Sequence, residues 1–394
     1  MTADPASVGP LDIRPEDFGW SQFGQMAEGR PWLGKSVVIT GGTGFIGARL
    51  ARKLARYGAS VKIPTRDKRR ATTRIDPNIR FVAWNPADEM SVAVACAGAD
   101  TLFNLAYDFR RSGEANVALY RTIADTAAKV GVHRFIHASS IAVYDGWLTE
   151  DLDENSPSDG PGSAYKMAKR AMERDLKARV GAGEFDAAII QPVNVYGPFS
   201  AMWTDAIVER IRAGGVALPR GFDGLNNGVY VDDVVDAFIA AADLSHGGAR
   251  RFIVAGPAPV PWTEMFAAYA QGCGRTLEFH EMQPASEAPE RVSGVAHSLK
   301  RAVSGLATHA GALLASRIGT ARVRALRARL PSLRGGNPSG PYRPVREDPR
   351  FYQSRAIVRA DRAATELCPP AVDAAEGLGR TKSYISWRLG SPTG

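Results

Sequence analysis

The chain has little cysteine and no long apolar run. Its 394 residues include three cysteines, Cys96, Cys273 and Cys368, which are too few and too scattered for a disulfide framework or a metal site. No uninterrupted apolar stretch approaches the roughly 20 residues that a membrane-spanning helix requires. The sequence therefore predicts no metal centre and no transmembrane segment, and it favours a reducing cytoplasm as the location.

Acidic residues are absent from one long segment. Residues 291–346 contain 11 Lys and Arg and no Asp or Glu. Removing these 11 from the 49 basic residues leaves 38 against 41 acidic ones, so the rest of the chain has a net charge of −3. The whole excess behind the formal net charge of +8 therefore lies in this segment.

The same segment has apolar residues at near-helical spacing, which predicts a basic amphipathic helical insertion over about residues 285–346. Two interpretations stay open. The insertion is either a peripheral contact with an anionic membrane surface or a lid over the substrate, or it packs on the substrate lobe with its arginines in solvent. Nucleic acid is not expected as a partner, because no recognition motif accompanies the charge. The pattern consists of Leu299, Val303, Leu306, Ala310, Leu313 and Leu314, followed by Arg317, Arg322, Arg324, Arg327 and Arg329 around Val323, Leu326 and Leu330.

Strand and helix patterns alternate from residue 36 to about residue 190, as in a doubly wound parallel sheet. With 45% hydrophobic residues the chain can bury one large core or two merged lobes. We predict an α/β fold with a dinucleotide-binding Rossmann core at residues 34–190 and a smaller substrate lobe within residues 191–394. Residues 1–33 lack the apolar core of a secretory signal and are interpreted as an N-terminal extension.

A glycine-rich turn follows the first predicted strand. Residues 36–39 form a short β-branched run, and residues 48–57 are predicted to be a helix. Between them, Gly41 permits a tight turn, Gly44 lets the backbone approach a pyrophosphate, and Gly47 allows the helix to pack closely on the strand. Amide N–H groups at the helix N-terminus then face the phosphates. The turn is therefore a candidate dinucleotide-binding loop, although glycine spacing alone is a weak signal.

Tyr165 and Lys169 are four residues apart on a helix predicted to start near Ser163, so both side chains lie on one face. A phenol titrates near pH 10, and a nearby ammonium favours the phenolate and lowers that value. We therefore expect Lys169 to lower the pKa of Tyr165. Ser140 is positioned in the sequence to bind a substrate oxygen while Tyr165 exchanges its proton.

The end of the second predicted strand, residues 61–65, carries the information on cofactor choice. An arginine there accommodates the extra phosphate of NADP, whereas a carboxylate binds the ribose of NAD. The strand is followed by Arg66 and then by Asp67. We favour NADP over NAD because the cation comes first, while Asp67 keeps the NAD alternative open.

The chain resembles the extended short-chain dehydrogenase/reductase family, also described as the NAD-dependent epimerase/dehydratase family. The resemblance covers roughly residues 34–280 and resumes near residues 351–388. It is carried by ThrGlyGlyThrGlyPheIleGly at 40–47, ThrLeuPheAsnLeuAla at 101–106, HisAlaSerSerIleAlaValTyr at 137–144, TyrLysMetAlaLys at 165–169, GlnProValAsnValTyrGlyPro at 191–198 and ValTyrValAspAspValValAspAlaPhe at 229–238.

The resemblance implies roles for individual residues. The family's catalytic serine falls at Ser140, and Asn116 would support the proton relay. Pro192 and Val195 would contact the nicotinamide end of the cofactor. The remaining cofactor contacts that it implies, together with those derived above, are Gly41, Thr43, Gly44, Phe45, Ile46, Gly47, Arg66, Leu105, Ala106, Tyr165 and Lys169.

Two departures from the family pattern narrow the reaction. Dehydratases carry an Asp-Glu pair directly after the serine or threonine, whereas this chain has Ile141 and Ala142, which argues against dehydration. Nucleotide-sugar enzymes commonly place an arginine before the Tyr-Val-Asp-Asp block to pair with a diphosphate. Residues 225–229 are LeuAsnAsnGlyVal, so the clamp is missing unless Arg220 or another basic residue replaces it.

Three functions follow from these residues. The leading hypothesis is an NAD(P)-dependent oxidoreductase that interconverts a secondary alcohol and a ketone on a hydrophobic or lipid-like substrate. The runner-up is a nucleotide-sugar epimerase. The third is a non-catalytic cofactor-binding protein that docks on a membrane or a partner through residues 291–346. The sequence leaves the substrate open, and a homodimer is an additional expectation.

Overall fold

The computed structural model describes residues 9–10, 31–67, 76–146, 149–218, 221–222, 224–244, 247–281 and 350–390. The predicted basic insertion at 285–346 and most of the N-terminal extension lie outside the described residues. Both therefore stay predictions. The described end of the extension includes Trp32, which is buried in the main core and contacts Phe103.

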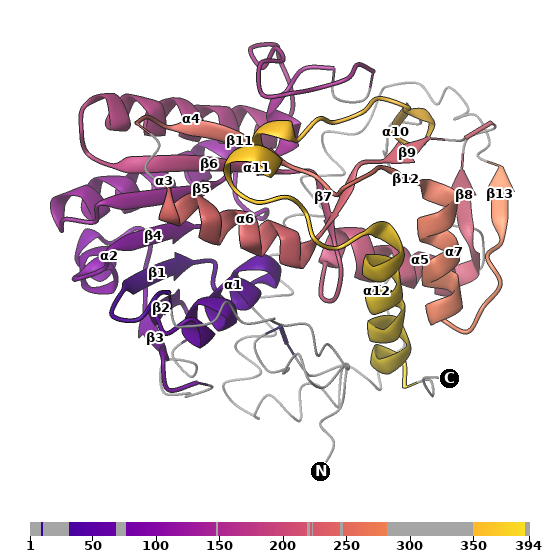
Figure 1. Ribbon diagram of the computed structural model, residues 1–394, viewed down its shortest axis with the longest axis horizontal. Helices are drawn as coiled ribbons and strands as arrows, with labels where there is room; N and C mark the ends of the chain where they lie inside the picture. Colours follow the sequence, from indigo (N-terminus) through magenta and orange to yellow (C-terminus); the bar gives the residue numbers. More distant parts are fainter. Residues whose placement is uncertain are drawn as a thin grey trace, which may run out of the picture.

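Seven parallel strands form the central sheet, in the order β11-β6-β5-β4-β1-β2-β3 (Figure 1). The order reverses direction between β1 and β4, which is the switch point of a doubly wound fold. The predicted Rossmann-type α/β fold is therefore confirmed. The strands are β1 (Ser36–Thr40), β2 (Ser60–Thr65), β3 (Ile79–Ala83), β4 (Thr101–Asn104), β5 (Arg134–Ala138), β6 (Asp186–Pro192) and β11 (Arg250–Val254).

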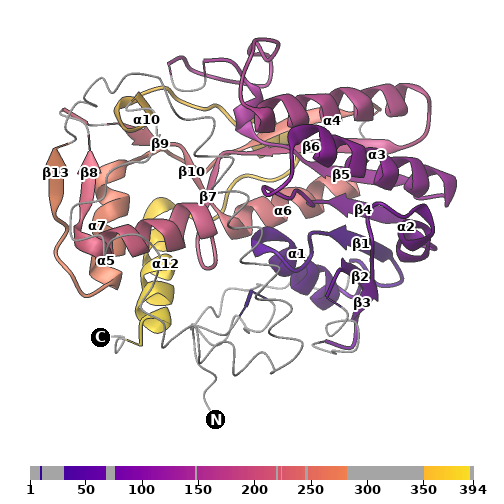
Figure 2. The same ribbon diagram turned by 180° about the vertical axis from the view of Figure 1, so that it is seen from behind.

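Helices cover both faces of this sheet, as the two views in Figures 1 and 2 show. Successive residues of β1 point to opposite faces, so Val37 packs in one core cluster and Val38 in the other. Helices α1 and α6 contact each other on the first face, and α3 contacts both α2 and α4 on the second. These helices are α1 (Phe45–Arg56), α2 (Glu89–Cys96), α3 (Gly113–Lys129), α4 (Ala164–Gly181) and α6 (Val231–Asp243).

Serine caps fix where α3 and α4 begin. Ser112 accepts a hydrogen bond from the Ala115 amide, and Ser163 accepts one from the Lys166 amide, each at 3.2 Å. The predicted start of α4 near Ser163 is therefore confirmed. Because α4 begins there, Tyr165 lies in its first turn, next to the carboxyl end of β5.

Most of the remaining elements lie beyond the carboxyl ends of the central strands (Figure 2), whereas α11 packs beside β11. The boundary between the Rossmann core and the substrate lobe at residue 190 stays a prediction. The outermost strand of the sheet, β11, comes from the part of the chain after that residue. The elements are η4 (Ile141–Val143), β7 (Asn194–Tyr196), η5 (Ala201–Asp205), α5 (Ala206–Gly214), β8 (Val216–Leu218), β9 (Leu225–Asn226), β10 (Gly228–Tyr230), β12 (Val260–Pro261), α7 (Trp262–Gly272), β13 (Phe279–Glu281), α10 (Arg350–Gln353), α11 (Asp361–Glu366) and α12 (Ala374–Arg388).

The C-terminal segment, residues 350–390, joins the two halves of the molecule. Helix α12 packs against α7 (Figure 1), and Val358 forms a parallel bridge with Leu152. Asp233 in α6 accepts hydrogen bonds from the amides of Ala371 at 2.9 Å and Val372 at 3.3 Å. The end of the chain is thus attached to the helix layer of the Rossmann core as well as to α7.

Asp233 makes stability depend on pH. It is 4% exposed, and burial raises the pKa of its carboxyl to about 6, against the opposing hydrogen bonds from Ala371 and Val372. Because the folded value lies above the unfolded one of about 3.9, this group stabilises the fold fully below about pH 4. That contribution is lost as the pH rises through about 6. Relative to Asp233→Asn, the wild type should lose about 2 kcal/mol of unfolding free energy between about pH 4 and pH 7.

Urea denaturation of both proteins across this pH range measures the effect. Asparagine keeps an oxygen that accepts from the two amides but has no charge to titrate. The difference between the two proteins should therefore change with pH, whereas parallel pH profiles would contradict the assignment.

Within the described ranges, no helix is long and apolar enough to cross a membrane. The same residues contain no group of three or more His, Cys, Asp or Glu side chains that could hold a metal ion. The predicted cytoplasmic location and the predicted homodimer stay predictions.

Candidate active site

The glycine-rich loop packs backbone against backbone at the start of α1. Gly41 has a positive φ of 73°, and the Gly44 amide donates to its carbonyl oxygen at 2.9 Å. A Cβ on Gly47 would lie 2.4 Å from that same oxygen. Helix α1 begins at Phe45 rather than at Ala48, and its N-cap, Gly44, places no side chain over the first turn. The amides at this end are therefore accessible to an anion.

A cavity of about 460 Å³ opens from this loop along the carboxyl ends of β1, β2 and β4. It brings together seven of the predicted cofactor or catalytic residues: Gly41, Thr43, Gly44, Arg66, Leu105, Ala106 and Asn116. Other residues of its wall were not predicted from the sequence, among them Trp84, Tyr107, Asp108 and Arg111. The glycine backbone, the open helix N-terminus and the size of the cavity fit a dinucleotide.

The other predicted cofactor residues do not line this cavity. Phe45 and Ile46 are half-buried and pack against the main core, and Gly47 is buried between α1 and the loop. Pro192 ends β6, Val195 lies in β7, and both are buried. Strand β6 pairs with β5, the strand that leads to Ser140. At the carboxyl edge of the sheet, Pro192 and Val195 therefore lie on the side of Ser140 and away from Arg66, which follows β2.

Ser140 and Tyr165 meet at the carboxyl end of β5. The Ser140 hydroxyl lies close enough to Tyr165 to lower the pKa of its phenol. The Ser140 hydroxyl accepts from the Ala142 amide at 3.2 Å, which fixes its position at the start of η4. The two residues come from different elements, a strand end and the first turn of α4, and the fold brings them together.

Lys169 lies one turn further along α4, beneath the tyrosine. It is 3% exposed, and its Nζ donates to the Ala138 carbonyl at 2.6 Å, 5.9 Å from the centre of the Tyr165 ring. Burial lowers the pKa of Lys169 to about 8, and the charge of Glu173 opposes that effect. The ammonium is therefore held in the protein interior by a carbonyl oxygen and a nearby carboxylate.

The prediction that the pKa of Tyr165 is lowered is wrong. Burial has the largest influence and raises the pKa of Tyr165, and the hydrogen bond with Ser140 counteracts it only in part. The nearby Tyr107 raises the pKa further. Tyr165 is accordingly a neutral phenol near neutral pH, which is the form that donates a proton.

Asn116 holds the backbone of the loop that precedes α3. Its Oδ1 accepts from the Asp108 amide at 2.9 Å, and its Nδ2 donates to the carbonyls of Asp108 at 3.0 Å and Ser112 at 2.9 Å. The side chain is 5% exposed. Because both ends of the amide are bonded to the loop backbone, Asn116 positions the loop between β4 and α3, and its support of the proton relay stays a prediction.

That loop covers Tyr165 with two aromatic rings. The Tyr107 ring meets the Tyr165 ring edge-on, with centroids 5.0 Å apart, and the Phe109 ring stacks on it at 5.5 Å with 24° between the planes. Lys169 Nζ lies 5.0 Å from the centre of the Tyr107 ring. The only sequence signal for this pair is its place directly after Leu105 and Ala106.

A buried polar cluster underlies the catalytic candidates. Glu173 accepts hydrogen bonds from Ser139 and, at 2.8 Å, from the Gln191 amide, and the Tyr144 hydroxyl donates to Gln191 at 2.8 Å. The spacing of Tyr165, Lys169 and Glu173, one every four residues, is the signal that could have identified Glu173.

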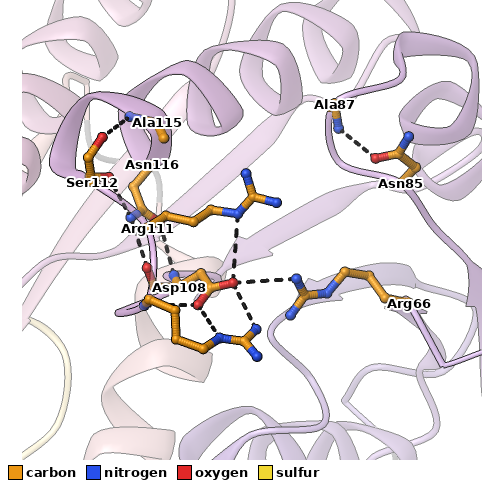
Figure 3. Close-up of polar contacts among 9 residues, drawn as sticks. Arg66, Asn85, Ala87, Asp108, Arg111, Ser112, Ala115 and Asn116 are labelled. Atoms are coloured by element: carbon orange, nitrogen blue, oxygen red, sulfur yellow. Dashed lines mark hydrogen bonds and ion pairs between the residues drawn. The ribbon is translucent and has the colours of Figure 1, made fainter. Parts of the chain in front are cut away.

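Asp108 is surrounded by three arginines at the mouth of the cavity. Arg110 donates twice to its carboxylate, from Nε and Nη2, each at 2.9 Å. Arg66 Nη1 lies 3.4 Å and Arg111 Nε 3.7 Å from Asp108 Oδ2 (Figure 3). The hydrogen bonds from Arg110 hold the pKa of Asp108 well below its ordinary range. Arg66 thus points across the cavity toward a carboxylate.

The residues at the position of the missing diphosphate-binding arginine form hydrogen bonds within the protein. Asn226 is 2% exposed, and its Oδ1 accepts from Asn194 at 2.8 Å. Asn227 donates to the Ala356 carbonyl at 2.8 Å and accepts from the Val358 amide at 2.9 Å. The side chains of both asparagines therefore link separate segments of the chain by hydrogen bonds. Arg220, the alternative clamp residue, lies outside the described residues.

Residues 37–256 match the model of the NAD-dependent epimerase/dehydratase family. A 3-beta-hydroxysteroid dehydrogenase of Mycolicibacterium neoaurum is 26% identical over 261 residues, 61% of this chain and 71% of that protein. A UDP-glucose 4-epimerase of Vibrio cholerae is 26% identical over 254 residues, 61% of this chain and 76% of that protein. The chain spans only 54% of another relative, the uncharacterized protein y4nG of Sinorhizobium fredii, at 25% identity over 53% of its own length.

Among solved structures, an epimerase of Methanothermobacter thermautotrophicus has the same fold, with a TM-score of 0.65, 17% identity and coverage of 92% of this chain and 95% of that one. The family model covers more than half of the chain, and the glycine loop and the Ser140, Tyr165 and Lys169 positions fall inside the matched range. The chain belongs to the NAD-dependent epimerase/dehydratase family.

Proposed function

We propose that this protein is an NAD(P)-dependent oxidoreductase that interconverts a ketone and a secondary alcohol. The observation that carries the proposal is the proximity of the Ser140 and Tyr165 hydroxyls, with Lys169 buried one turn further along α4. This arrangement places a proton donor beside a hydroxyl that can bind a carbonyl oxygen. The absence of an Asp-Glu pair at Ile141 and Ala142 supports redox chemistry without dehydration.

In the reductive direction the substrate carbonyl oxygen accepts hydrogen bonds from Ser140 and Tyr165. The reduced dinucleotide, when bound, supplies the hydride that the carbonyl carbon receives. Tyr165 gives its phenolic proton to the oxygen as the C=O bond becomes a C–O bond, so that one hydride and one proton complete the alcohol. The ammonium of Lys169 then stabilises the phenolate left behind. The raised pKa of Tyr165 supports this direction, because a neutral phenol is the acid that the step needs.

The loop over Tyr165 supports a substrate with an apolar body. Phe109 is 71% exposed although it stacks on the proposed acid/base, so it presents an aromatic surface to an incoming molecule. The asparagines at 226 and 227 offer no cation for a diphosphate. We therefore propose a hydrophobic ketone or alcohol as substrate, with NADP favoured over NAD because Arg66 lies in the cavity wall. Membrane contact through residues 291–346 remains part of this proposal.

Assays of hydride transfer test the reaction. The full chain is incubated with reduced NADP or NAD, deuterated at the transferring carbon, and with two substrate panels, ketosteroids and UDP-hexoses. We expect stoichiometric oxidation of the dinucleotide and deuterium on the carbinol carbon of a ketosteroid-type product.

Other outcomes contradict the proposal in distinguishable ways. Interconversion of UDP-glucose and UDP-galactose without net consumption of dinucleotide would identify an epimerase. Binding of a dinucleotide without turnover of either panel or of any ketone that co-purifies with the chain would favour the non-catalytic alternative.

A further inference from the structure

The ion pair between Arg66 and Asp108 crosses the proposed dinucleotide cavity. Strand β1 lies between β2 and β4 in the sheet. Arg66 directly follows β2, and Asp108 lies in the loop after β4, so their contact at 3.4 Å passes over the carboxyl end of β1, where Gly41 begins the loop. All three residues line the same cavity. Figure 3 shows the two side chains pointing toward each other.

Asp108 does not depend on Arg66 for a partner. Both donors of Arg110 bind its carboxylate at 2.9 Å, whereas Arg66 and Arg111 approach Oδ2 at 3.4 and 3.7 Å. Arg110 does not line the cavity, but Arg66 and Arg111 do. If Arg66 turns to another anion, Asp108 keeps its two shortest hydrogen bonds. The exchange therefore leaves no buried carboxylate unpaired.

Among the described residues, the charged side chains of the cavity wall balance one another. They are Arg66 and Arg111 against Asp67 and Asp108. A dinucleotide whose adenosine ribose carries an extra phosphate brings additional negative charge next to Arg66. Asp108 occupies Arg66 and so limits its attraction for that phosphate, whereas it has no such effect on a dinucleotide with a free ribose hydroxyl.

We propose that Asp108 is a specificity-determining residue of the dinucleotide site, a resident counter-ion that competes with the ribose phosphate of NADP for Arg66. The proposal rests on the proposed dinucleotide-dependent function and assigns to the loop between β4 and α3 a part of the choice between NADP and NAD. Arg66 supplies the attraction and Asp108 limits it, so the wild-type preference for NADP is smaller than an arginine alone would give.

Calorimetric titration with NADPH and with NADH tests the proposal on the full chain. Asp108→Asn keeps the size of the side chain and removes its charge. We expect the ratio of the NADH to the NADPH dissociation constant to rise about three- to fivefold, the range expected for a partly exposed ion pair. Glu114→Gln is the matched control, because Glu114 is exposed, carries the same charge and does not line the cavity. It should leave the ratio unchanged.

A second pair of variants separates competition for Arg66 from a general disturbance of the loop. In an Arg66→Gln background, adding Asp108→Asn should change the ratio by less than about twofold. A ratio that stays the same or falls in Asp108→Asn overturns the inference, as does an equal rise without Arg66. If the wild type binds neither dinucleotide, the proposed function fails. If it binds both and the ratio does not respond, only the role of Asp108 is refuted.

Discussion

Replacing Tyr165 by phenylalanine should lower turnover by about 10² to 10⁴-fold, the contribution typical of a positioned general acid. The substitution removes the hydroxyl next to Ser140 and leaves the ring in contact with Tyr107 and Phe109. The aromatic packing over the site should therefore survive while the proton donor is lost. The measurement is the initial rate of dinucleotide oxidation with the ketone that the wild type reduces fastest.

Tyr57→Phe serves as the control for this prediction. It makes the same chemical change at the end of α1, and Tyr57 does not line the dinucleotide cavity. Its rate should stay within about twofold of the wild type, as is usual for a substitution away from a site. A Tyr165→Phe variant whose rate falls by less than tenfold would show that another group supplies the proton.

Truncating Trp262 to alanine should cost about 3 to 5 kcal/mol of unfolding free energy. Trp262 begins α7 and is 1% exposed. Its ring stacks on Phe266 at 5.6 Å and meets Tyr352 edge-on at 5.2 Å. Tyr352 belongs to the C-terminal segment and also contacts Phe266 of α7, so the alanine variant removes one of two aromatic contacts between Tyr352 and α7. Urea denaturation followed by circular dichroism measures the loss.

Two further variants calibrate this result. Trp262→Phe keeps an aromatic ring and should lose markedly less than the alanine variant. Met202→Ala truncates a side chain that is 58% exposed in η5, and it should change stability by less than about 0.5 kcal/mol. A loss below about 1 kcal/mol for Trp262→Ala would mean that residues 350–390 do not depend on this contact.

The sequence predicts those parts of the site that depend on local spacing. The glycine loop follows a β-branched strand, and Tyr165 and Lys169 lie four residues apart on one capped helix, so their common face follows from helix geometry. The doubly wound parallel sheet also follows, because strands and helices alternate along residues 36–190. Helix starts are less predictable: α3 begins at Gly113 because Ser112 caps it.

Contacts between distant segments were not predictable. The pKa of Tyr165 is raised because the fold buries it beneath Tyr107 and Phe109, which come from a loop more than 50 residues earlier. Arg66 and Asp108 are 42 residues apart and meet only because β2 and β4 flank β1. One sequence offers no signal for such pairs, since they depend on how loops of particular length leave the sheet.

The loop between β4 and α3 constrains its own length. Tyr107 and Phe109 contact Tyr165, while the residue between them, Asp108, faces the arginines on the other side. Inserting or deleting one residue before Tyr107 would exchange the two sides, placing a carboxylate against the phenol and an aromatic ring among the guanidinium groups. Side chains in this loop can therefore be exchanged for similar ones, but the register of Tyr107, Asp108 and Phe109 relative to β4 cannot shift by a single residue.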